Sequence, residues 1–508
     1  MTSLGDVVDA SRQVAATRSR SQKVAILAGL LRKLEPSEVP IAVAFLAGVP
    51  RQGRIGIGYS TLRAIAPARA PAGGVAQAAL EVIEVDRAID EIVALAGSGS
   101  ARRRSQRLEA LLARATPEEV EFVGRLLTGE LRQGALAGIM ADAIASAAEV
   151  PSELVRRALM LSGNLSRTAD IALAAGGEGL RGVGFEVFRP ILPMLASTAN
   201  NVAEAVEGFA CASVEWKLDG IRVQIHRRAR EVRIFTRNLN DITAALPGVV
   251  QAVLALPLEQ AVLDGEALWM AEGGPASFQE TVSRIDRDAP PEGIVTFLFD
   301  LLHLEGEDLL DTPLRVRAER LQAVAPGLTI PRVLTSDPET ARGVLEESLQ
   351  AGHEGVVVKD AASLYAAGRR GGAWRKVKPV QTYDLVVLGA EWGHGRRQGW
   401  LSNLHLGARD PGTGGFAMVG KCFKGLTDEL LEWQTRELLA RETERRGIAV
   451  LVRPELVVEI AIDGVQVSAR YPGGIALRFA RVKRYRPDKR ADEADSIEEL
   501  RRLLPHRV

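Results

Sequence analysis

The 508-residue chain has only two cysteines, Cys211 and Cys422, and six histidines. Two cysteines cannot form a disulfide framework or a four-thiolate zinc site, and such sparse use fits a reducing cytoplasm. The histidines show no paired-ligand spacing of the HExxH kind, which argues against a histidine-based metal site. No apolar run approaches the roughly 20 residues that span a bilayer, and the N-terminus shows no signal or lipidation pattern. These absences predict a soluble, intracellular protein.

The common phosphate-binding and kinase motifs are missing as well. Gly420-Lys421 is followed by Cys422 instead of the serine or threonine of a P-loop, and GRIGIG at 53–58 lacks the GxGxxG spacing. The kinase signatures HRD and DFG do not occur. The sequence therefore disfavours a P-loop ATPase, a Rossmann dehydrogenase and a protein kinase.

An excess of charge of one sign is also lacking, because 64 lysines and arginines balance 64 aspartates and glutamates. The charges are nevertheless unevenly spread. Residues 366–378 and 470–490 are strongly basic, whereas residues 76–91 and 491–499 are acidic. Local basic stripes, rather than the total, decide whether a phosphate backbone is attracted. The balanced total therefore does not exclude a nucleic-acid partner.

The composition that is present, 46% hydrophobic and 25% charged, is that of a globular protein. At about 150 residues per domain, the length predicts roughly three domains. Residues 1–200 have apolar positions at helical spacing and predict an all-α domain. Within it, TPEEVEFVGRLL begins with a typical N-cap, Thr116, and with Pro117 at the first helical position.

The rest of the sequence predicts two further domains. Residues 201–380 contain alternating runs such as VRIFTRN, with helical segments at 313–324 and 340–351, and predict an α/β (α+β) domain. Residues 381–508 combine short strands and glycine-rich turns with one helical segment at 427–446. Short strands with a single helix are typical of a small β-barrel of the OB-fold type.

Charged side chains alternate along the predicted strands of the middle region. Because residues i and i+2 of a strand lie on the same face, Glu215 shares a face with Lys217, and Asp264 with Glu266. Lysines that bind phosphate beside carboxylates that bind a divalent cation provide the chemistry of nucleotide transfer. The candidate residues are Glu215, Lys217, Arg222, Arg237, Asp264, Glu266, Glu354, Lys376 and Lys378.

Six short motifs follow one another along the chain: KLDG at 217–220, DGE at 264–266, FLFD at 297–300, EGVVVK at 354–359, WRKVK at 374–378 and RFARVKRYRPDK at 478–489. In this order they resemble the motifs of an ATP-dependent DNA ligase of the long archaeal-type and replicative class, in the covalent nucleotidyltransferase superfamily. The likeness covers residues 200–490 by motif and the helical third by general character. Ala480 departs from the family, whose last motif often carries proline there.

The resemblance implies a nick-sealing reaction in DNA replication, repair or recombination. Lys217 would attack the α-phosphorus of ATP and carry AMP, which would pass to a DNA 5′-phosphate before a neighbouring 3′-hydroxyl expels it. Mg²⁺, with Mn²⁺ as an alternative, would assist, held by Glu266 and Glu354. The helical first domain would bind DNA, the second would carry out adenylation, and the third would be the OB fold.

The resemblance also implies roles around the nucleotide. Glu215 would accept a hydrogen bond from the adenine amino group, and Phe299 would stack on the base. Arg222, Arg237 and Glu266 would fix the ribose and the incoming 5′-phosphate. The residues that would hold the phosphates are Arg370, Lys376 and Lys378. Those that would close over ATP when the OB domain swings in are Arg478, Arg481, Lys483, Asp488 and Lys489.

Taken singly, several of these residues have simpler explanations. Glu215 could form an ion pair with Lys217 across a sheet face. Phe299 could belong to the core, and its alternating neighbour Phe297 could be the stacking residue instead. Glu266 could be an ordinary charge at a strand end.

Other functions also remain open at this level. An RNA ligase or an mRNA-capping guanylyltransferase shares Lys-x-Asp-Gly, although capping enzymes generally lack such a helical N-terminal domain. A non-catalytic DNA-binding scaffold is a third hypothesis, against which the intact Lys217 argues. The expected partner is nicked duplex DNA, bound mostly through phosphates. A cytoplasmic monomer is expected, nucleoid-associated in a prokaryote, with a sliding clamp or repair proteins as further partners and no membrane.

Overall fold

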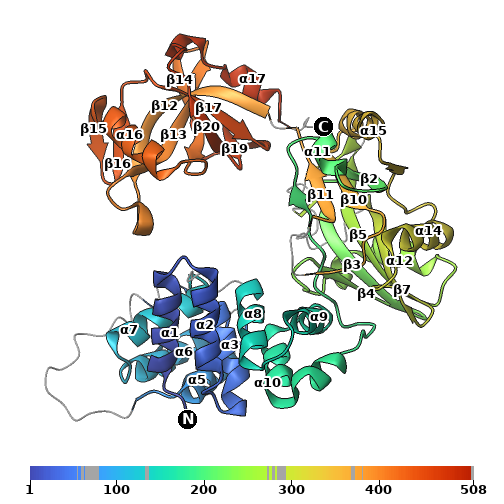
Figure 1. Cartoon of the computed structure of the whole chain (residues 1–508). Coiled ribbons are helices and arrows are strands. Elements are labelled where there is room, and N and C mark those ends of the chain that lie inside the picture. The colour runs from blue at the N-terminus through green and yellow to red at the C-terminus, as the bar shows by residue number, and fades with distance from the viewer. Residues whose placement is uncertain are drawn as a thin grey trace, which may run out of the picture. The chain divides into compact units, whose positions relative to one another are not determined.

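The structure is a computed structural model that describes residues 1–53, 55, 57–58, 62, 79–131, 137–271, 274–276, 281–282, 293–367, 372–379 and 381–504. The chain forms two compact units, drawn in Figure 1 with colours that run from the N-terminus to the C-terminus. Unit 1 comprises Met1–Trp269, Phe278–Ser348 and Val356–Lys376, and unit 2 comprises Met270–Ser277, Leu349–Gly355 and Val377–Val508. The domain boundaries expected near residues 200 and 380 stay predictions.

The N-terminal part of unit 1 is built from helices that enclose one apolar core. Helix α7 shows why they begin where they do. Thr116 accepts a hydrogen bond from the N–H of Glu119, the Glu119 carboxylate accepts one from the N–H of Thr116, and Pro117 occupies the first turn. The helices are α1 Leu4–Ala16, α2 Arg20–Leu31, α3 Val39–Ala47, α5 Val82–Ala94, α6 Ser100–Leu112, α7 Pro117–Thr128, α8 Ala137–Ala147, α9 Ser152–Ser162 and α10 Leu165–Arg181.

Two β-sheets follow these helices in the chain. The five-stranded sheet has the order β1-β11-β10-β2-β9, and the six-stranded sheet has the order β4-β3-β5-β7-β8 with β6 paired to β5. Their strands are β1 Ser197–Thr198, β2 Ala212–Lys217, β3 Ile221–Arg228, β4 Glu231–Thr236, β5 Gln260–Ala271, β6 Gly274–Pro275, β7 Ile294–Leu304, β8 Glu307–Asp308, β9 Arg332–Thr335, β10 Gly355–Asp360 and β11 Trp374–Val377.

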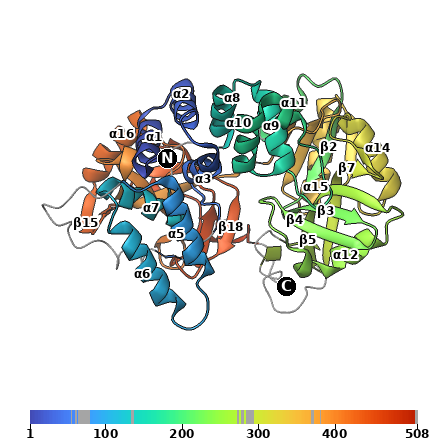
Figure 2. The same cartoon turned by 90° about the horizontal axis from the view of Figure 1, so that it is seen from below.

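Helices cover the outer side of the six-stranded sheet. Helix α14 packs against β7, and α12 contacts β4 and β7; Figures 1 and 2 both show the two helices beside this sheet. The helices of this part are α11 Val202–Val206, α12 Pro247–Leu254, α14 Leu314–Val324 and α15 Pro338–Gln350. The helical segments predicted at 313–324 and 340–351 are thus confirmed as α14 and α15, within two residues at each end.

Strand β3 has two faces with different surroundings, as the period of two along a strand requires. Val223 and Ile225 are fully buried in the core that includes α12 and α14 residues. Arg222, Gln224 and His226 occupy the opposite face. Gln224 and His226 are also buried, with 4% and 0% of their surface exposed. A buried face of polar side chains must find hydrogen-bond partners there.

Unit 2 contains a seven-stranded curled sheet in which the long strand β12 pairs with β13 and with both β16 and β17. This arrangement, with one helix among the strands, confirms the predicted OB-fold class. The elements are β12 Gln381–Trp392, β13 Leu401–Asp410, β14 Gly415–Cys422, α16 Asp428–Leu439, β15 Glu442–Arg446, β16 Ala449–Val452, β17 Val457–Ile462, β18 Gly464–Val467, β19 Ile475–Arg478, β20 Arg481–Tyr485 and α17 Ile497–Arg501.

The helix predicted over residues 427–446 is too long. Helix α16 ends at Leu439, and Glu442–Arg446 form strand β15, which pairs antiparallel with β16. The turn between the two strands contains Gly447 with a positive φ of 61°. Pairing with β16 therefore overrides the helix preference of the ETERR sequence.

Within the described residues, no helix combines the length and the apolar character needed to cross a bilayer.

Candidate active site

Lys217, the last residue of β2, lines a cavity of about 730 Å³ in unit 1. The size lies within the range of pockets that hold small-molecule ligands. Basic side chains suited to phosphate and carboxylates suited to cations meet in its wall. The charged residues that line it are Glu215, Lys217, Asp219, Arg222, Arg237, Glu266, Lys359 and Lys376.

Two glycines allow close backbone contacts here, Gly220 between the Lys217 turn and β5, and Gly265 between β5 and β7. A Cβ atom on Gly220, the last residue of KLDG, would lie 2.4 Å from the carbonyl oxygen of Ala267 and 3.0 Å from Cγ of Glu266. A Cβ atom on Gly265 would lie 2.7 Å from the carbonyl oxygen of Phe297. The glycine of Lys-x-Asp-Gly is therefore needed for a close approach, which brings the lysine turn against the strand that carries Glu266.

Glu215 is buried and pairs with cations from two neighbouring strands. Its carboxylate lies 2.5 Å from Nζ of Lys359 in β10 and 3.7 Å from Nη1 of Arg332 in β9. Ser213 donates a further hydrogen bond of 2.9 Å to it. An ion pair with Lys217 alone, the simpler interpretation of Glu215, does not describe these contacts. The carboxylate is instead fixed from several sides at the cavity wall.

Arg222 is held in place by one carboxylate and one carbonyl. Its Nε and Nη2 atoms donate hydrogen bonds of 3.0 and 2.6 Å to Asp264, and Nη1 donates one of 2.6 Å to the carbonyl of Met194. Tyr365 donates a 2.8 Å hydrogen bond to the same Asp264 carboxylate. Burial alone would lower the pKa of Arg222, but the Asp264 carboxylate outweighs it and raises the pKa. Arg222 is therefore a fixed cation at the cavity wall.

Glu266 is the carboxylate with the most perturbed ionisation in the cavity. Burial raises its pKa to about 7, although Lys217 and Arg222 act in the opposite direction. Near pH 7, Glu266 is therefore only partly ionised, and its protonated form binds cations poorly. A cation placed beside Glu266 would favour the ionised form of the carboxylate, so cation binding and ionisation of Glu266 would promote each other.

The aromatic wall of the cavity holds a lysine, Lys359, that the sequence did not single out. Phe299 of β7 and Trp374 of β11 both line it. The Nζ atom of Lys359 lies 4.3 Å from the ring centre of Phe299 and 4.2 Å from that of Trp374. Burial lowers the pKa of Lys359, with Glu215 opposing the shift. The available signal was a lysine at the end of the apolar run GVVVK, on the same face as the cavity residue Val357.

The remaining predicted residues fall into three groups. Arg237, exposed in the turn after β4, and Lys376 of β11 line the cavity. Glu354 and Lys378 belong to unit 2, where Nζ of Lys378 lies 2.6 Å from the Glu354 carboxylate. Arg370 lies outside the described residues.

The described part of the chain contains no group of three or more histidine, cysteine, aspartate or glutamate side chains arranged for a metal ion. Any ion in the cavity would therefore need oxygen atoms from its substrate and from water in addition to protein carboxylates such as Glu266, which is the usual coordination of Mg²⁺ beside nucleotides.

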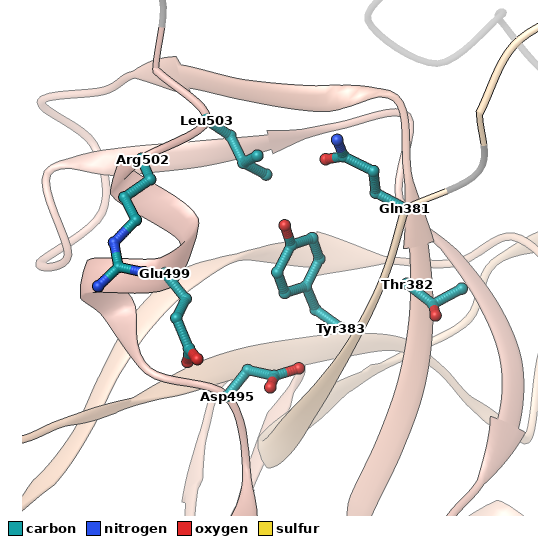
Figure 3. A pocket seen from close by; sticks show the side chains of 7 residues that line it. All are labelled: Gln381, Thr382, Tyr383, Asp495, Glu499, Arg502 and Leu503. Carbon is teal, nitrogen blue, oxygen red and sulfur yellow. The ribbon is translucent and has the colours of Figure 1, made fainter. Parts of the chain in front are cut away.

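A second cavity, of about 470 Å³, lies in unit 2 between the start of β12 and α17. Figure 3 shows the Tyr383 ring in the middle of its labelled side chains, with the carboxyl groups of Asp495 and Glu499 on one side. Burial raises the pKa of Tyr383 and of Asp495. With two carboxyl groups and a single cation, Arg502, this cavity is poorly suited to a polyphosphate.

A lysine at a strand end, set in a cavity of fixed cations and carboxylates and accompanied by a helical region and an OB fold, defines a nucleotidyltransferase with accessory domains. The family model described as ATP dependent DNA ligase domain matches residues 193–378. The models for the ATP dependent DNA ligase C terminal region and the DNA ligase N terminus match residues 397–489 and 3–145.

Relatives agree with these matches over the whole length. A probable DNA ligase of Saccharopolyspora erythraea is 55% identical, over 99% of this chain and 98% of the relative. A probable DNA ligase of Rhodococcus opacus is 54% identical, over 98% of this chain and 99% of the relative. The chain therefore belongs to the family of ATP-dependent DNA ligases. This confirms the predicted enzyme class and use of ATP, and an RNA ligase or capping enzyme is not favoured.

Solved structures support the fold. Those named Pmar-Lig_PreS3 and Pmar-Lig_Pre superpose with TM-scores of 0.60 and 0.61, and they cover 94% and 95% of this chain and 99% of each of their own chains. At 20% and 19% identity, this likeness concerns the arrangement of the backbone alone.

Proposed function

We propose that this ligase seals nicks in duplex DNA through an AMP adduct on Lys217. The observation that carries the proposal is the position of Lys217 in a cavity of about 730 Å³ that also contains Glu215, Arg222, Glu266 and Lys376. Such a cavity has room for a nucleotide. Its carboxylates can accept hydrogen bonds from the base, and its basic side chains can bind the phosphates.

The reaction would proceed in three steps. The neutral amine of Lys217 attacks the α-phosphorus of ATP, so that an N–P bond forms, the bond to the β-phosphate oxygen breaks and pyrophosphate leaves. An oxygen of a DNA 5′-phosphate then attacks the same phosphorus and Lys217 leaves. Finally, a 3′-hydroxyl attacks the activated 5′-phosphorus, which forms the phosphodiester bond and expels AMP. Positioning and charge neutralisation are the main contributions that such steps need.

Around the base, we assign recognition to Glu215 and stacking to Phe299. The Glu215 carboxylate is an acceptor held by Lys359 and Arg332, which suits the amino group of adenine and disfavours the carbonyl of guanine. Phe299 presents an aromatic ring on the cavity wall, whereas Phe297 packs at the edge of the core.

Around the sugar and phosphates, we assign contacts to Arg222, Arg237 and Lys376, which line the cavity. Arg222 is already oriented by Asp264, so little of its freedom would be lost on binding. Arg370 and Lys378 are proposed as further phosphate contacts from sequence motifs alone.

We propose Mg²⁺, with Mn²⁺ as an alternative, as the metal that assists these steps. The ion would neutralise phosphate charge, and Glu266 would hold it as an ionised carboxylate. Glu354 remains a candidate second carboxylate, and its contact with Lys378 would then have to open.

For the substrate, we propose nicked double-stranded DNA held largely by its phosphates. A monomer is sufficient for this reaction, since Lys217 and the residues assigned to the nucleotide come from one chain. We also propose a cytoplasmic location at the nucleoid, and a sliding clamp or repair proteins as partners in replication, repair or recombination.

The direct test is incubation with α-labelled ATP and magnesium, followed by a chase with nicked duplex. The wild-type chain should form a labelled adduct that disappears as the nick is sealed. Lys217→Ala should form no detectable adduct, whereas Lys33→Ala, at an exposed position in the helical region, should behave as the wild type. A labelled adduct on Lys217→Ala would contradict the proposal.

Substrate comparison tests the remaining detail. Labelling with ATP but not GTP, and sealing of nicked DNA in preference to nicked RNA, is the expected result. Labelling by GTP would instead point to a guanylyltransferase.

A further inference from the structure

A proline-containing segment connects the helical part of unit 1 to the Lys217 cavity. This segment, the strap, comprises residues 188–194 (FRPILPM) and follows α10 in the chain. The next two residues, Leu195 and Ala196, line the cavity. Pro190 and Pro193 carry no N–H group, so the strap has few backbone donors to satisfy. The strap lies against the polar face of β3, where three alternate side chains hold its backbone.

Gln224 binds the strap as a neighbouring strand would. Its Oε1 atom accepts a hydrogen bond of 2.8 Å from the N–H of Ile191, and its Nε2 atom donates one of 3.2 Å to the carbonyl oxygen of the same residue. Both residues are buried, so water cannot replace these bonds. Removal of the amide would leave two backbone groups of Ile191 without partners in the interior.

His226 fixes the orientation of that amide. Its Nδ1 atom accepts a 2.9 Å hydrogen bond from the N–H of Phe188, so the ring proton must reside on Nε2, which lies 2.9 Å from Oε1 of Gln224. Burial lowers the pKa of His226 to about 3, with His303 acting in the same direction, so the ring is neutral. One tautomer and one amide orientation thus satisfy both ring nitrogens of His226, the amide oxygen of Gln224 and both backbone groups of Ile191.

Arg222, the third residue of this face, reaches the end of the strap. It donates to the carbonyl of Met194, while the N–H of Met194 donates a 3.1 Å hydrogen bond to Tyr365. The position of the strap therefore decides where the guanidinium of Arg222 and the wall formed by Leu195 and Ala196 stand relative to the cavity.

We propose that Gln224 and His226 are positioning residues for ATP binding, which act by holding the strap against β3. The inference rests on the proposed function of the Lys217 cavity. It assigns a role to two buried polar residues that do not line the cavity.

The test is the ATP dependence of adduct formation by Gln224→Met, which keeps the side-chain length and removes both hydrogen bonds to Ile191. We expect the KM for ATP to rise about tenfold, whereas the rate at saturating ATP changes much less. A merely destabilised protein would contain fewer active molecules, but those molecules would keep the wild-type KM. Hydrogen exchange should also speed up at the amides of Phe188, Ile191 and Met194.

The matched control is Gln251→Met on the exposed surface of α12, which should retain the wild-type KM. If Gln224→Met does not fold, Gln224→Asn, which withdraws the amide by one methylene group, is judged by the same criterion. A folded variant with the wild-type KM and unchanged exchange would overturn the positioning role alone. Absence of an adduct in the wild-type chain would overturn the proposed function and this inference together.

Discussion

Glu266 connects the electrostatics of the cavity to the stability of the protein. Its pKa of about 7 in the folded chain lies above the value of about 4.3 expected in the unfolded chain. A group with a raised folded pKa stabilises the fold fully below its unfolded pKa, and this contribution is lost as the pH rises through the folded pKa. At pH 8, the ionised Glu266 therefore destabilises the protein unless a cation is bound.

We predict that Glu266→Gln raises the thermal unfolding midpoint by a few degrees at pH 8 in chelator and without nucleotide, since each pKa unit corresponds to about 1.36 kcal/mol. At pH 4.5 the midpoint should not rise, because Glu266 is then protonated in the folded chain. Calorimetry at the two pH values checks this. Glu347→Gln, on the exposed side of α15, should change neither midpoint. An unchanged midpoint for Glu266→Gln at pH 8 would refute the account.

Individual side chains differ in how far the sequence reveals their surroundings. Lys217 and Glu266 stand in short motifs that resemble those of a known family, and the structure places both at one cavity. Lys359 and Arg332 could not be predicted as the partners of Glu215, because they come from strands far apart in the chain that only the folded sheet brings together. The contact between Tyr365 and Asp264 could not be predicted either, because the two residues are 101 positions apart in the chain.

At the scale of the element, the approach of β3 to β5 depends on Gly220. A methyl group there would overlap the carbonyl oxygen of Ala267 and press on Glu266. The strand pair would have to separate at the point where Arg222 stands opposite Glu266 in the β3–β5 register.

Gly220→Ala is therefore predicted to lower the rate of adduct formation by at least about tenfold, the cost of roughly 1.4 kcal/mol in the transition state. Rapid-quench labelling with ATP measures it. Gly343→Ala in α15 is the control, because its Cβ atom would meet no described atom within 4 Å. That change should leave labelling intact and stabilise the helix by about 0.5–1 kcal/mol. Normal labelling by Gly220→Ala would show that the strand pair tolerates the methyl group.

Elements with strong local signals were predictable, and those set by pairing were not. Helix α7 begins at the predicted proline because its capping box is complete within four residues. The segment that becomes β15 has the charged composition of a helix, and its strand conformation depends on β16 beyond the Gly447 turn. Local sequence does not contain that contact, so the helix was predicted about seven residues too long.

At the scale of the whole molecule, the balanced total charge is compatible with exposed basic side chains on one strand of unit 2. Arg481 and Lys483 alternate on β20 and are exposed. Arg486 and Lys489 of the same basic stretch are instead paired with carboxylates, Arg486 with Asp384 and Asp488 at 2.9 and 2.7 Å and Lys489 with Asp384 at 2.6 Å. Only part of the basic sequence is therefore available for a phosphate backbone.

We predict that affinity for nicked duplex falls roughly a hundredfold or more between about 50 and 200 mM salt, with little dependence on base sequence. Fluorescence anisotropy over a salt series measures the slope. Arg481→Ala and Lys483→Ala should each reduce its magnitude by about one. Arg486→Ala should leave the slope nearly unchanged, because Asp384 and Asp488 already pair with that charge. Equal affinity at both salt concentrations would contradict phosphate-dominated binding.

The buried imidazole of His226 in β3 affects how the protein responds to acidic pH. The unfolded chain takes up a proton at His226 near pH 6.5, whereas the folded chain resists it to about pH 3, so stability falls as the pH drops through that window. In every molecule that remains folded, however, His226 stays neutral, so the hydrogen bonds between β3 and residues 188–194 are kept. Mild acidification would thus protonate Glu266 before it protonates His226, and activity would return on neutralisation without any refolding.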